Sequence, residues 1–202
     1  NPFGVGQTVT QGIISATGRS DLGINTYEDF IQTDAAINPG NSGGALIDVA
    51  GNLIGVNTAI FSQSGGSLGI GFAIPAKVCQ QVLNSILKDG RVVRGWLGIS
   101  LLPPTQDDVL APKQQVGVVV ADVLKNGPAD AAGIKVGDKI VQVNNEPITS
   151  ASHLINYVAL QAPNSEINVL VEREGKQQNY VVTVGERKAQ NTQSQYIPLP
   201  RR

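Results

Sequence analysis

Residues 32–46 read QTDAAINPGNSGGAL, and within this stretch Ser42 lies on a run of small residues that spans residues 38–44. A serine that acts as a nucleophile needs an exposed hydroxyl group and nearby backbone N–H groups that point at the developing oxyanion. Glycines permit such a turn, because larger side chains would block the substrate carbonyl group. The stretch therefore predicts a nucleophile turn that leads into a strand, although an ordinary glycine-rich turn would have the same composition.

The residues around this turn predict a mainly β unit that ends near residue 90. Apolar and β-branched runs predict strands over residues 7–15, 44–49, 52–60 and 70–74, with a loop over 16–27 and a hairpin turn at Ala50-Gly51. Apolar residues at helical spacing predict a helix over residues 76–88. Cys79 lies beside the apolar stripe of this helix and is expected to be a small packed residue rather than a reactive thiol.

A second, small unit is predicted after a short junction at residues 91–95. Its patterns indicate strands over residues 96–100, 116–122, 138–144, 166–173 and 178–184, and helices over residues 128–133 and 151–160. This mixture and a length of about ninety residues are typical of a small α+β domain. Residues 188–202 are polar, contain two prolines and are expected to form an extended tail.

The composition excludes several classes of protein. Among 202 residues, 15 are Lys or Arg and 16 are Asp or Glu, so the net charge of −1 gives no support for a nucleic-acid partner. The single cysteine excludes an internal disulfide, and the single histidine, His153, excludes a multi-histidine metal site. No apolar run approaches the roughly 20 residues that span a bilayer. The absence of methionine indicates a processed chain or a piece of a longer protein.

Several segments together are similar to the HtrA/Deg family of PDZ-containing serine proteases. The similarity rests on five segments: residues 12–16, 32–46, 69–75, 91–99 and 128–140. It implies the second half of a chymotrypsin-like double β-barrel over residues 1–90. A PDZ domain is then expected over residues 91–187, followed by the polar tail. The fold class expected from the resemblance is mainly β with an α+β domain.

The resemblance also implies roles for residues of the first unit. Ser42 is the nucleophile, and the oxyanion hole is formed by the backbone of Gly40, Asn41 and Ser42. The pocket for the side chain before the scissile bond is lined by Ile37, Ile60 and Ile70, which would favour Val, Ala or another small aliphatic side chain. An extended substrate pairs with the strand at Asn57, Thr58 and Ala59. Arg19 joins a loop relay that switches the oxyanion hole. Core packing of the isoleucines and an exposed loop position for Arg19 are the alternatives.

The general base of such a protease is missing from these residues. The mechanism needs a histidine and an aspartate that orients it, and in the family both precede the serine. The residues before Ser42 include no histidine, and the three candidate aspartates, Asp21, Asp29 and Asp34, do not match the triad position. His153 lies in a predicted helix of the second unit, where a solvent-facing or groove-edge role is expected. The chain alone is therefore expected to be inactive, and no metal or organic cofactor is needed for the mechanism.

The second unit is expected to bind a peptide C-terminus between a strand and a helix. The resemblance places the peptide carboxylate on a loop and strand made by Gly95, Trp96, Leu97, Gly98 and Ile99, with Arg94 adding a positive charge. Two faces of the helix could line this groove. One face presents Leu154 and Val158, and the other presents Ile155 and Ala159. Trp96 is either the lip of the groove or an anchor between the two units.

The resemblance implies a parent serine endopeptidase that works in the bacterial periplasm on unfolded or extended polypeptides, with a C-terminal peptide at the PDZ groove as localiser or trigger. A single PDZ domain is most similar to the stress sensors that are anchored in the inner membrane through an upstream segment, and the family assembles as homotrimers. Two alternatives stay open. One is a non-catalytic peptide-binding module, and the other is one chain of a nicked two-chain protease.

Overall fold

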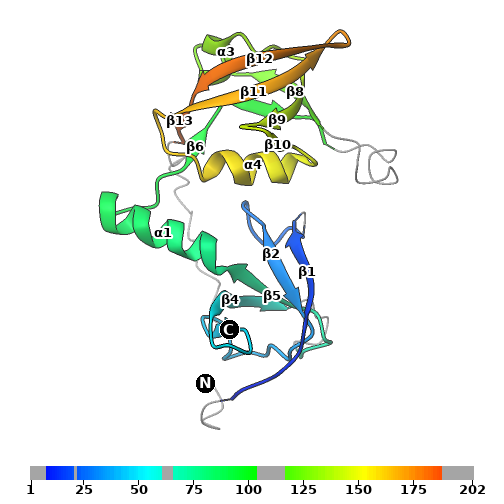
Figure 1. Cartoon of the computed structure of the whole chain (residues 1–202), viewed down its shortest axis with the longest axis vertical. Coiled ribbons are helices and arrows are strands. Elements are labelled where there is room, and N and C mark those ends of the chain that lie inside the picture. Colours follow the sequence, from blue (N-terminus) through cyan, green and yellow to red (C-terminus); the bar gives the residue numbers. More distant parts are fainter. Residues whose placement is uncertain (1–7, 21, 61–65, 104–116, 188–202) are drawn as a thin grey trace, which may run out of the picture.

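The computed structural model describes residues 8–20, 22–60, 66–103 and 117–187, and it shows a mainly β chain with a sheet at each end (Figure 1). The first sheet uses strands between residues 14 and 75, and the other sheets use strands between residues 95 and 186. We call these parts the first unit and the second unit. The predicted polar tail lies outside the described residues, and the predicted boundary near residue 90 stays a prediction.

The first unit is a five-stranded antiparallel sheet with the order β1-β2-β5-β4-β3. Its strands are β1 (Ile14–Arg19), β2 (Phe30–Thr33), β3 (Ala45–Ile47), β4 (Leu53–Ile60) and β5 (Gly71–Pro75). The core of the sheet contains Phe30 and Phe72, whose ring centroids are 5.8 Å apart. The hairpin at Ala50-Gly51 is confirmed, because β3 and β4 pair across it.

The sequence prediction was wrong at the start of this sheet. A strand was expected over residues 7–15 and a loop over 16–27, but β1 begins at Ile14 and continues to Arg19. The partner that extends it is β2, which the sequence prediction missed because four residues are too few to show a clear alternation. Residues 10–13 are instead tied to the segment after β2, where the Thr10 hydroxyl donates to the Ala36 carbonyl oxygen at 3.0 Å.

Helix α1 (Ala76–Asp89) follows β5 directly, as predicted, but its apolar stripe is not buried. No residue of α1 is buried within the described structure, and Leu83 and Leu87 are 54% and 76% exposed. The helix contacts β4 and β5 near its start and then extends away from the sheet (Figure 1). Cys79 is half-buried on this helix, and burial raises the pKa of its thiol, which makes the reactive thiolate scarcer at neutral pH.

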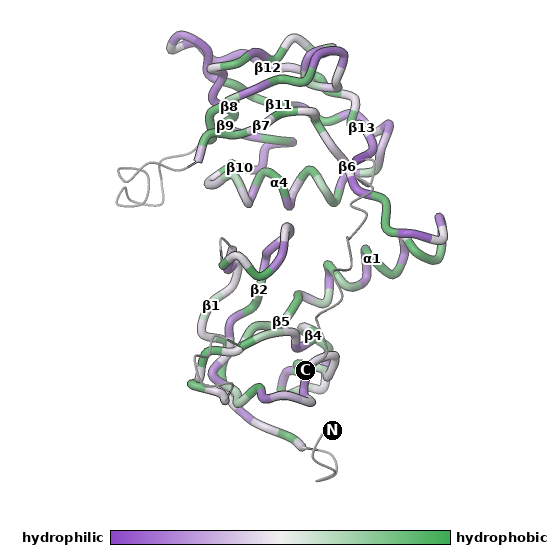
Figure 2. The backbone as a smooth tube through the Cα atoms, turned by 180° about the vertical axis from the view of Figure 1, so that it is seen from behind, coloured by the Kyte–Doolittle hydropathy of each residue, from purple (hydrophilic) through white to green (hydrophobic). Residues whose placement is uncertain are grey.

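The second unit is built on a six-stranded antiparallel sheet with the order β12-β11-β9-β8-β7, to which β10 adds beside β9. Its strands are β7 (Ile99–Leu101), β8 (Val118–Val123), β9 (Lys139–Val143), β10 (Glu146–Pro147), β11 (Glu166–Arg173) and β12 (Lys176–Thr183). A separate two-stranded ladder joins β6 (Gly95–Trp96) to β13 (Gly185–Glu186). The apolar residues of β8, β9 and β11 show as green segments in Figure 2, and they form the core with Leu154 and Val158.

Two helices complete the second unit, α3 (Pro128–Ala132) and α4 (Ala151–Ala159). The Ser150 hydroxyl caps α4 by accepting from the His153 N–H at 3.0 Å. In both views α4 lies on the side of the second unit that faces the loop between β1 and β2 (Figures 1 and 2). No helix in the described part of the chain is long and apolar enough to cross a bilayer.

The expected strand at residues 96–100 is broken into β6 and β7. Gly98 has a φ of 76°, a left-handed conformation that interrupts the extended backbone between the two strands. The Gly98 carbonyl oxygen accepts from the Leu124 N–H at 2.8 Å, and the Leu97 carbonyl oxygen accepts from the Ala129 N–H at 2.9 Å. The break therefore creates a short loop that is fixed on one side by β8 and α3.

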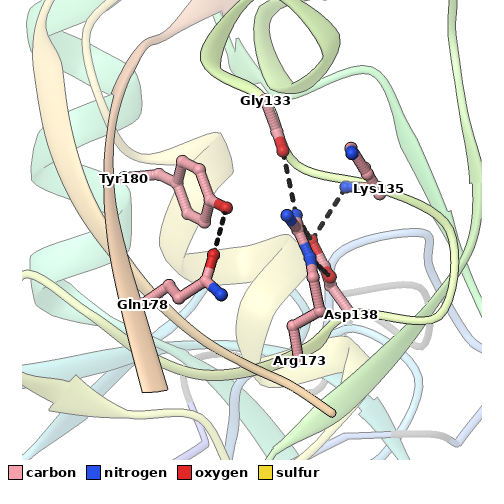
Figure 3. Close-up of polar contacts among 6 residues, drawn as sticks. All are labelled: Gly133, Lys135, Asp138, Arg173, Gln178 and Tyr180. Carbon is pink, nitrogen blue, oxygen red and sulfur yellow. Dashed lines mark hydrogen bonds and ion pairs between the residues drawn. The ribbon is translucent and has the colours of Figure 1, made fainter. Parts of the chain in front are cut away.

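A buried ion pair holds one side of the second unit together (Figure 3). The Asp138 side chain is 1% exposed, and its two carboxylate oxygens accept from the Arg173 guanidinium at 2.6 and 2.7 Å. Burial raises the pKa of the Asp138 carboxyl group, but the bonds from Arg173 and the Lys135 N–H, with the charge of Arg173, hold this pKa below its ordinary value. Arg173 also donates to the Gly133 carbonyl oxygen at 2.9 Å, so the pair ties β9 and β11 to the end of α3.

Candidate active site and peptide groove

Ser42 lies on an exposed turn between β2 and β3, and the surrounding glycines shape this turn. Gly40 and Gly43 have φ angles of 104° and 83°, which L side chains rarely adopt. The Gly43 N–H donates to the Asn57 carbonyl oxygen at 2.8 Å, which fixes the turn against β4. The Ser42 hydroxyl donates to the Thr58 carbonyl oxygen at 3.3 Å. The hydroxyl is therefore exposed and held by one weak contact.

Some backbone N–H groups around Ser42 form hydrogen bonds within the described structure, and others do not. The Asn41 N–H donates to the Asn38 carbonyl oxygen at 3.0 Å, and the Gly44 N–H donates to the Asn41 carbonyl oxygen at 2.9 Å. The N–H groups of Gly40 and Ser42 have no hydrogen-bond partner among the described residues. An oxyanion hole needs unpaired donors such as these two. Asn41 was also predicted to contribute, but its N–H is already paired with Asn38 in this conformation.

The three isoleucines that were predicted to line a substrate pocket meet around Gly71. Ile37 is 3% exposed, and a Cβ atom added to Gly71 would lie 2.8 Å from the Ile37 Cδ1 atom. Ile60 pairs with Gly71 across the β4–β5 ladder, and Ile70 directly precedes it. The missing side chain at Gly71 thus provides the space that Ile37 enters.

The predicted substrate strand borders the serine turn. Strand β3 and the Gly43-Gly44 turn cover one edge of β4 as far as Asn57. Beyond Asn57, Ala59 and Ile60 pair only with β5 among the described residues, and Thr58 lies at an irregularity of that ladder. This leaves an open strand edge next to Ser42, onto which an extended polypeptide can add as a further strand.

Arg19 ends β1, and its Nε atom donates to the Gln32 Oε1 atom at 2.8 Å. The loop that follows is organised by Glu28, a residue that the sequence analysis missed. The Glu28 side chain is 4% exposed, and its carboxylate accepts from the N–H groups of Leu22 and Asn25 at 2.6 and 2.8 Å and from that of Ile24. Burial raises the pKa of Glu28, but the bonds from Asn25, Leu22, Ile24 and Gly23 lower it by more, so the pKa lies below its ordinary value.

We predict that Glu28→Gln loosens this loop at neutral pH. A charged carboxylate that accepts several N–H groups stabilises its conformation only while it is ionised. The pKa of Glu28 is lowered in the folded state. The stabilisation is therefore complete above the pKa of an ordinary glutamate, and it is lost as the pH falls through the lowered pKa of Glu28. Hydrogen–deuterium exchange at residues 22–25 should be about tenfold faster in the variant at pH 7.

The matched control for this prediction is Asp29→Asn, because Asp29 is the neighbouring carboxylate and is exposed. Its exchange pattern should equal that of the unmodified protein. Equal protection of residues 22–25 in Glu28→Gln and in the unmodified protein at pH 7 would contradict the assigned role.

The second unit has a groove of about 720 Å³ between the β6–β7 segment and α4. Its strand side is formed by the predicted residues Gly95, Trp96, Leu97, Gly98 and Ile99. Its helix side is formed by Ala151, Leu154, Ile155 and Val158. Leu154 and Val158 belong to the core and also line the groove, and Ile155 lines it too. The groove therefore uses residues from both helix faces that the sequence analysis considered. Ala159 is buried and does not line the groove.

Tyr27 and Arg187 also line this groove, and neither was singled out from the sequence. Arg94 does not line the groove. Its guanidinium carbon instead lies 4.0 Å from the centroid of the Tyr27 ring. Asn156 of α4 donates to the Glu28 carbonyl oxygen, so the loop of the first unit contacts the second unit through both Tyr27 and Glu28. No sequence pattern signals these contacts, because they join residues that lie far apart in the chain.

Comparisons with known proteins identify two types of domain in the chain. The chain matches the trypsin-like peptidase domain over residues 1–56 and the PDZ domain over residues 95–184. It is 48% identical over 188 residues to a Chlamydia pneumoniae protein named "Probable periplasmic serine endoprotease DegP-like", with 92% of this chain and 38% of the relative covered. A protein of the same name from Bartonella henselae is 48% identical over 184 residues, which cover 90% and 36%. The chain belongs to the HtrA/Deg family.

Solved structures of the HtrA/Deg family show the same fold. The HtrA-type protease AlgW with a tripeptide is 53% identical, with a TM-score of 0.75 over 95% of this chain and 64% of that structure. A serine endoprotease from Yersinia pestis is 44% identical, with a TM-score of 0.59 over 93% and 60%. The chain spans less than two fifths of the length of the two DegP-like relatives.

Among the described residues, no side chain that could act as a base forms a hydrogen bond with Ser42. Its only histidine, His153, contacts the Thr149 hydroxyl through Nδ1 at 3.1 Å and belongs to the cap of α4. Asp34 accepts from the Ile13 N–H at 2.7 Å, and Asp21 lies outside the described residues. No group of three or more metal-ligating side chains is found in the described ranges.

Proposed function

We propose that the protein to which this chain belongs is a serine endopeptidase with Ser42 as its nucleophile. The observation that carries the proposal is the exposed Ser42 hydroxyl beside two unpaired N–H groups and an open edge of β4. The relatives named serine endoproteases support it. Because relatives are also named periplasmic, we place the protein in the bacterial periplasm.

The proposed reaction is acyl transfer. The Ser42 hydroxyl gives its proton to a base outside this chain's residues, and Oγ forms a bond to the substrate carbonyl carbon. The N–H groups of Gly40 and Ser42 donate to the oxyanion that develops, and the leaving amine takes the proton from the base. Water then hydrolyses the acyl-enzyme. In this conformation Ser42 donates to Thr58, so its side chain must turn away from β4 before it reacts.

The proposed substrates are unfolded or extended polypeptides. An added strand at residues 58–60 requires an extended backbone. The predicted lining of Ile37, Ile60 and Ile70 would favour a small aliphatic side chain before the scissile bond. The resemblance further suggests a homotrimer, an upstream membrane anchor and a role for Arg19 in switching the oxyanion hole, and we retain these as parts of the proposal.

We predict that the full-length protein cleaves peptides after Val or Ala at least about tenfold better than after Phe or Lys. Ile60→Ala should widen the pocket and reduce this preference, because a half-buried wall is removed. The measurement is kcat/KM on a set of unstructured peptides that differ only at that residue. Ile47→Ala is the matched control, because Ile47 is exposed on β3 and should leave the preference unchanged. Preferred cleavage after Lys or Phe would contradict the assigned pocket.

A peptide-binding module without catalysis is the second candidate, and it is favoured by the lack of a base among these residues. Adding an upstream fragment that carries a histidine and an aspartate separates the candidates. Recovered cleavage supports the endopeptidase and includes the case of a nicked two-chain enzyme. Peptide binding without cleavage by any longer form of the protein supports the module.

A further inference from the structure

Arg187 lines the peptide groove next to the segment that was predicted to hold a peptide C-terminus. It follows β13, and its N–H donates to the Arg94 carbonyl oxygen at 2.9 Å, which extends the ladder between β13 and β6. The ladder places Arg187 opposite Arg94, directly before the predicted carboxylate-binding segment at residues 95–99, and Arg187 lines the groove. A peptide that pairs with β7 has its C-terminus at this loop.

The first unit holds the Arg187 side chain in position. Its Nη1 atom donates to the Tyr27 hydroxyl oxygen at 3.1 Å, and its guanidinium carbon lies 5.8 Å from the centroid of the Tyr27 ring. Arg94 contacts the same ring at 4.0 Å. The next residue, Glu28, holds the Tyr27 backbone in place. Its carboxylate accepts from N–H groups of the loop, and its carbonyl oxygen accepts from the Asn156 side chain. Tyr27 of the first unit therefore positions the guanidinium group of Arg187 in the second unit.

This end of the groove has an excess of positive charge. Glu186, which also lines the groove, forms an ion pair with Arg91 at 2.7 Å. Neither Arg94 nor Arg187 forms an ion pair with a carboxylate in the described part of the chain. Two guanidinium groups on one aromatic ring repel each other unless an anion lies nearby. The last carbonyl groups of α4 also face this end, since a Cβ atom on Gly95 would meet the Val158 carbonyl oxygen at 2.3 Å.

We propose that Arg187, positioned by Tyr27, supplies the charge that recognises the terminal carboxylate of a peptide in the groove. This inference rests on the proposed peptide-binding function of the second unit. The negative end of α4 disfavours an anion there, and a nearby cation offsets this effect. Arg187 contributes a charge-assisted contact, while Tyr27 is a positioning residue that makes peptide recognition depend on both units.

The test compares one fluorescent decapeptide ending in Val-Val-Val as the free acid and as the C-terminal amide. The 202-residue chain should bind the free acid more tightly. Arg187→Gln should weaken free-acid binding about tenfold with little effect on the amide, and Arg187→Lys should recover part of the loss. Tyr27→Phe keeps the ring but removes the hydroxyl, and should lower the ratio of acid to amide affinity by about threefold.

The matched control is Lys176→Gln, which removes one charge from the far hairpin of the second unit. Thermal unfolding of each variant shows that it is folded. Unchanged free-acid affinity in folded Arg187→Gln would overturn the inference while leaving the peptide groove intact. A further peptide ends in Asp and has an amidated C-terminus, so that its charge is on a side chain. If this peptide binds as tightly as the free acid, the groove does not recognise the terminal carboxylate itself, and the inference is overturned. No binding of either peptide to the unmodified chain would reject the peptide groove itself.

Discussion

Replacing Ser42 by alanine is expected to reduce kcat of the full-length protein by about 10⁵- to 10⁶-fold. Nothing else on the turn offers a nucleophile, because the neighbouring residues are Asn41 and Gly43. The unpaired N–H groups of Gly40 and Ser42 would remain after the change. These groups can retain only the weak catalysis that stabilisation of an oxyanion gives without covalent attack. Cleavage of an unfolded protein by the purified variant is the measurement.

Ser15→Ala serves as the matched control for this change, because Ser15 is an exposed serine on β1. Its activity should equal that of the unmodified protein. Peptide binding by Ser42→Ala should also be unchanged, which shows that the second unit is folded. If Ser42→Ala keeps more than a small fraction of the activity, a different residue is the nucleophile.

Replacing Arg173 by methionine is expected to lower the free energy of unfolding of the second unit by about 3–5 kcal/mol. The change leaves the Asp138 carboxylate buried without its two strongest hydrogen bonds, and only the Lys135 N–H still donates to it. It also removes the contact of Arg173 with the Gly133 carbonyl oxygen and with the Tyr180 ring. Urea unfolding followed by the fluorescence of Trp96 measures the loss.

Three further measurements test whether the Asp138–Arg173 pair causes this loss of stability. Lys176→Met removes an exposed cation next to the same hairpin and should cost less than about 1 kcal/mol. The double change Asp138→Leu and Arg173→Met should recover part of the loss, because no unpaired charge stays buried. Since the pKa of Asp138 is lowered, the difference between Arg173→Met and the unmodified protein should shrink as the pH falls below the ordinary Asp pKa. A loss under 1 kcal/mol at pH 7 would show that the pair does not stabilise this unit.

The sequence predicted most elements of the fold because their patterns are local. The predicted strands over residues 166–173 and 178–184 are an example, and φ angles of 51° and 74° at Glu174 and Gly175 suit the two-residue turn that joins them. The turn at Ser42 is another, because its glycines adopt the positive φ angles that larger residues avoid. Strand β2 was missed, since it is defined by its neighbours β1 and β5 rather than by its own four residues.

The site was predictable in part for the same reason. The nucleophile turn and the loop after Gly95 are contiguous in sequence, so both could be named in advance. The positions of Tyr27, Glu28 and Arg187 depend on contacts between residues 128 to 160 positions apart, as in the bonds from Asn156 to Glu28 and from Arg187 to Tyr27. The exposed stripe of α1 likewise could not be predicted, because helical periodicity does not show what covers a helix face.

The most direct test of the account is labelling of Ser42 by a fluorophosphonate, which reacts with an activated serine, followed by peptide mass mapping. The measurement uses the full-length protein and, in parallel, the 202-residue chain alone. We expect one label on Ser42 in the full-length protein and none on the chain alone, which lacks a histidine before Ser42. A full-length protein that stays unlabelled, or that is labelled on another serine, would contradict the assignment of Ser42 as the nucleophile.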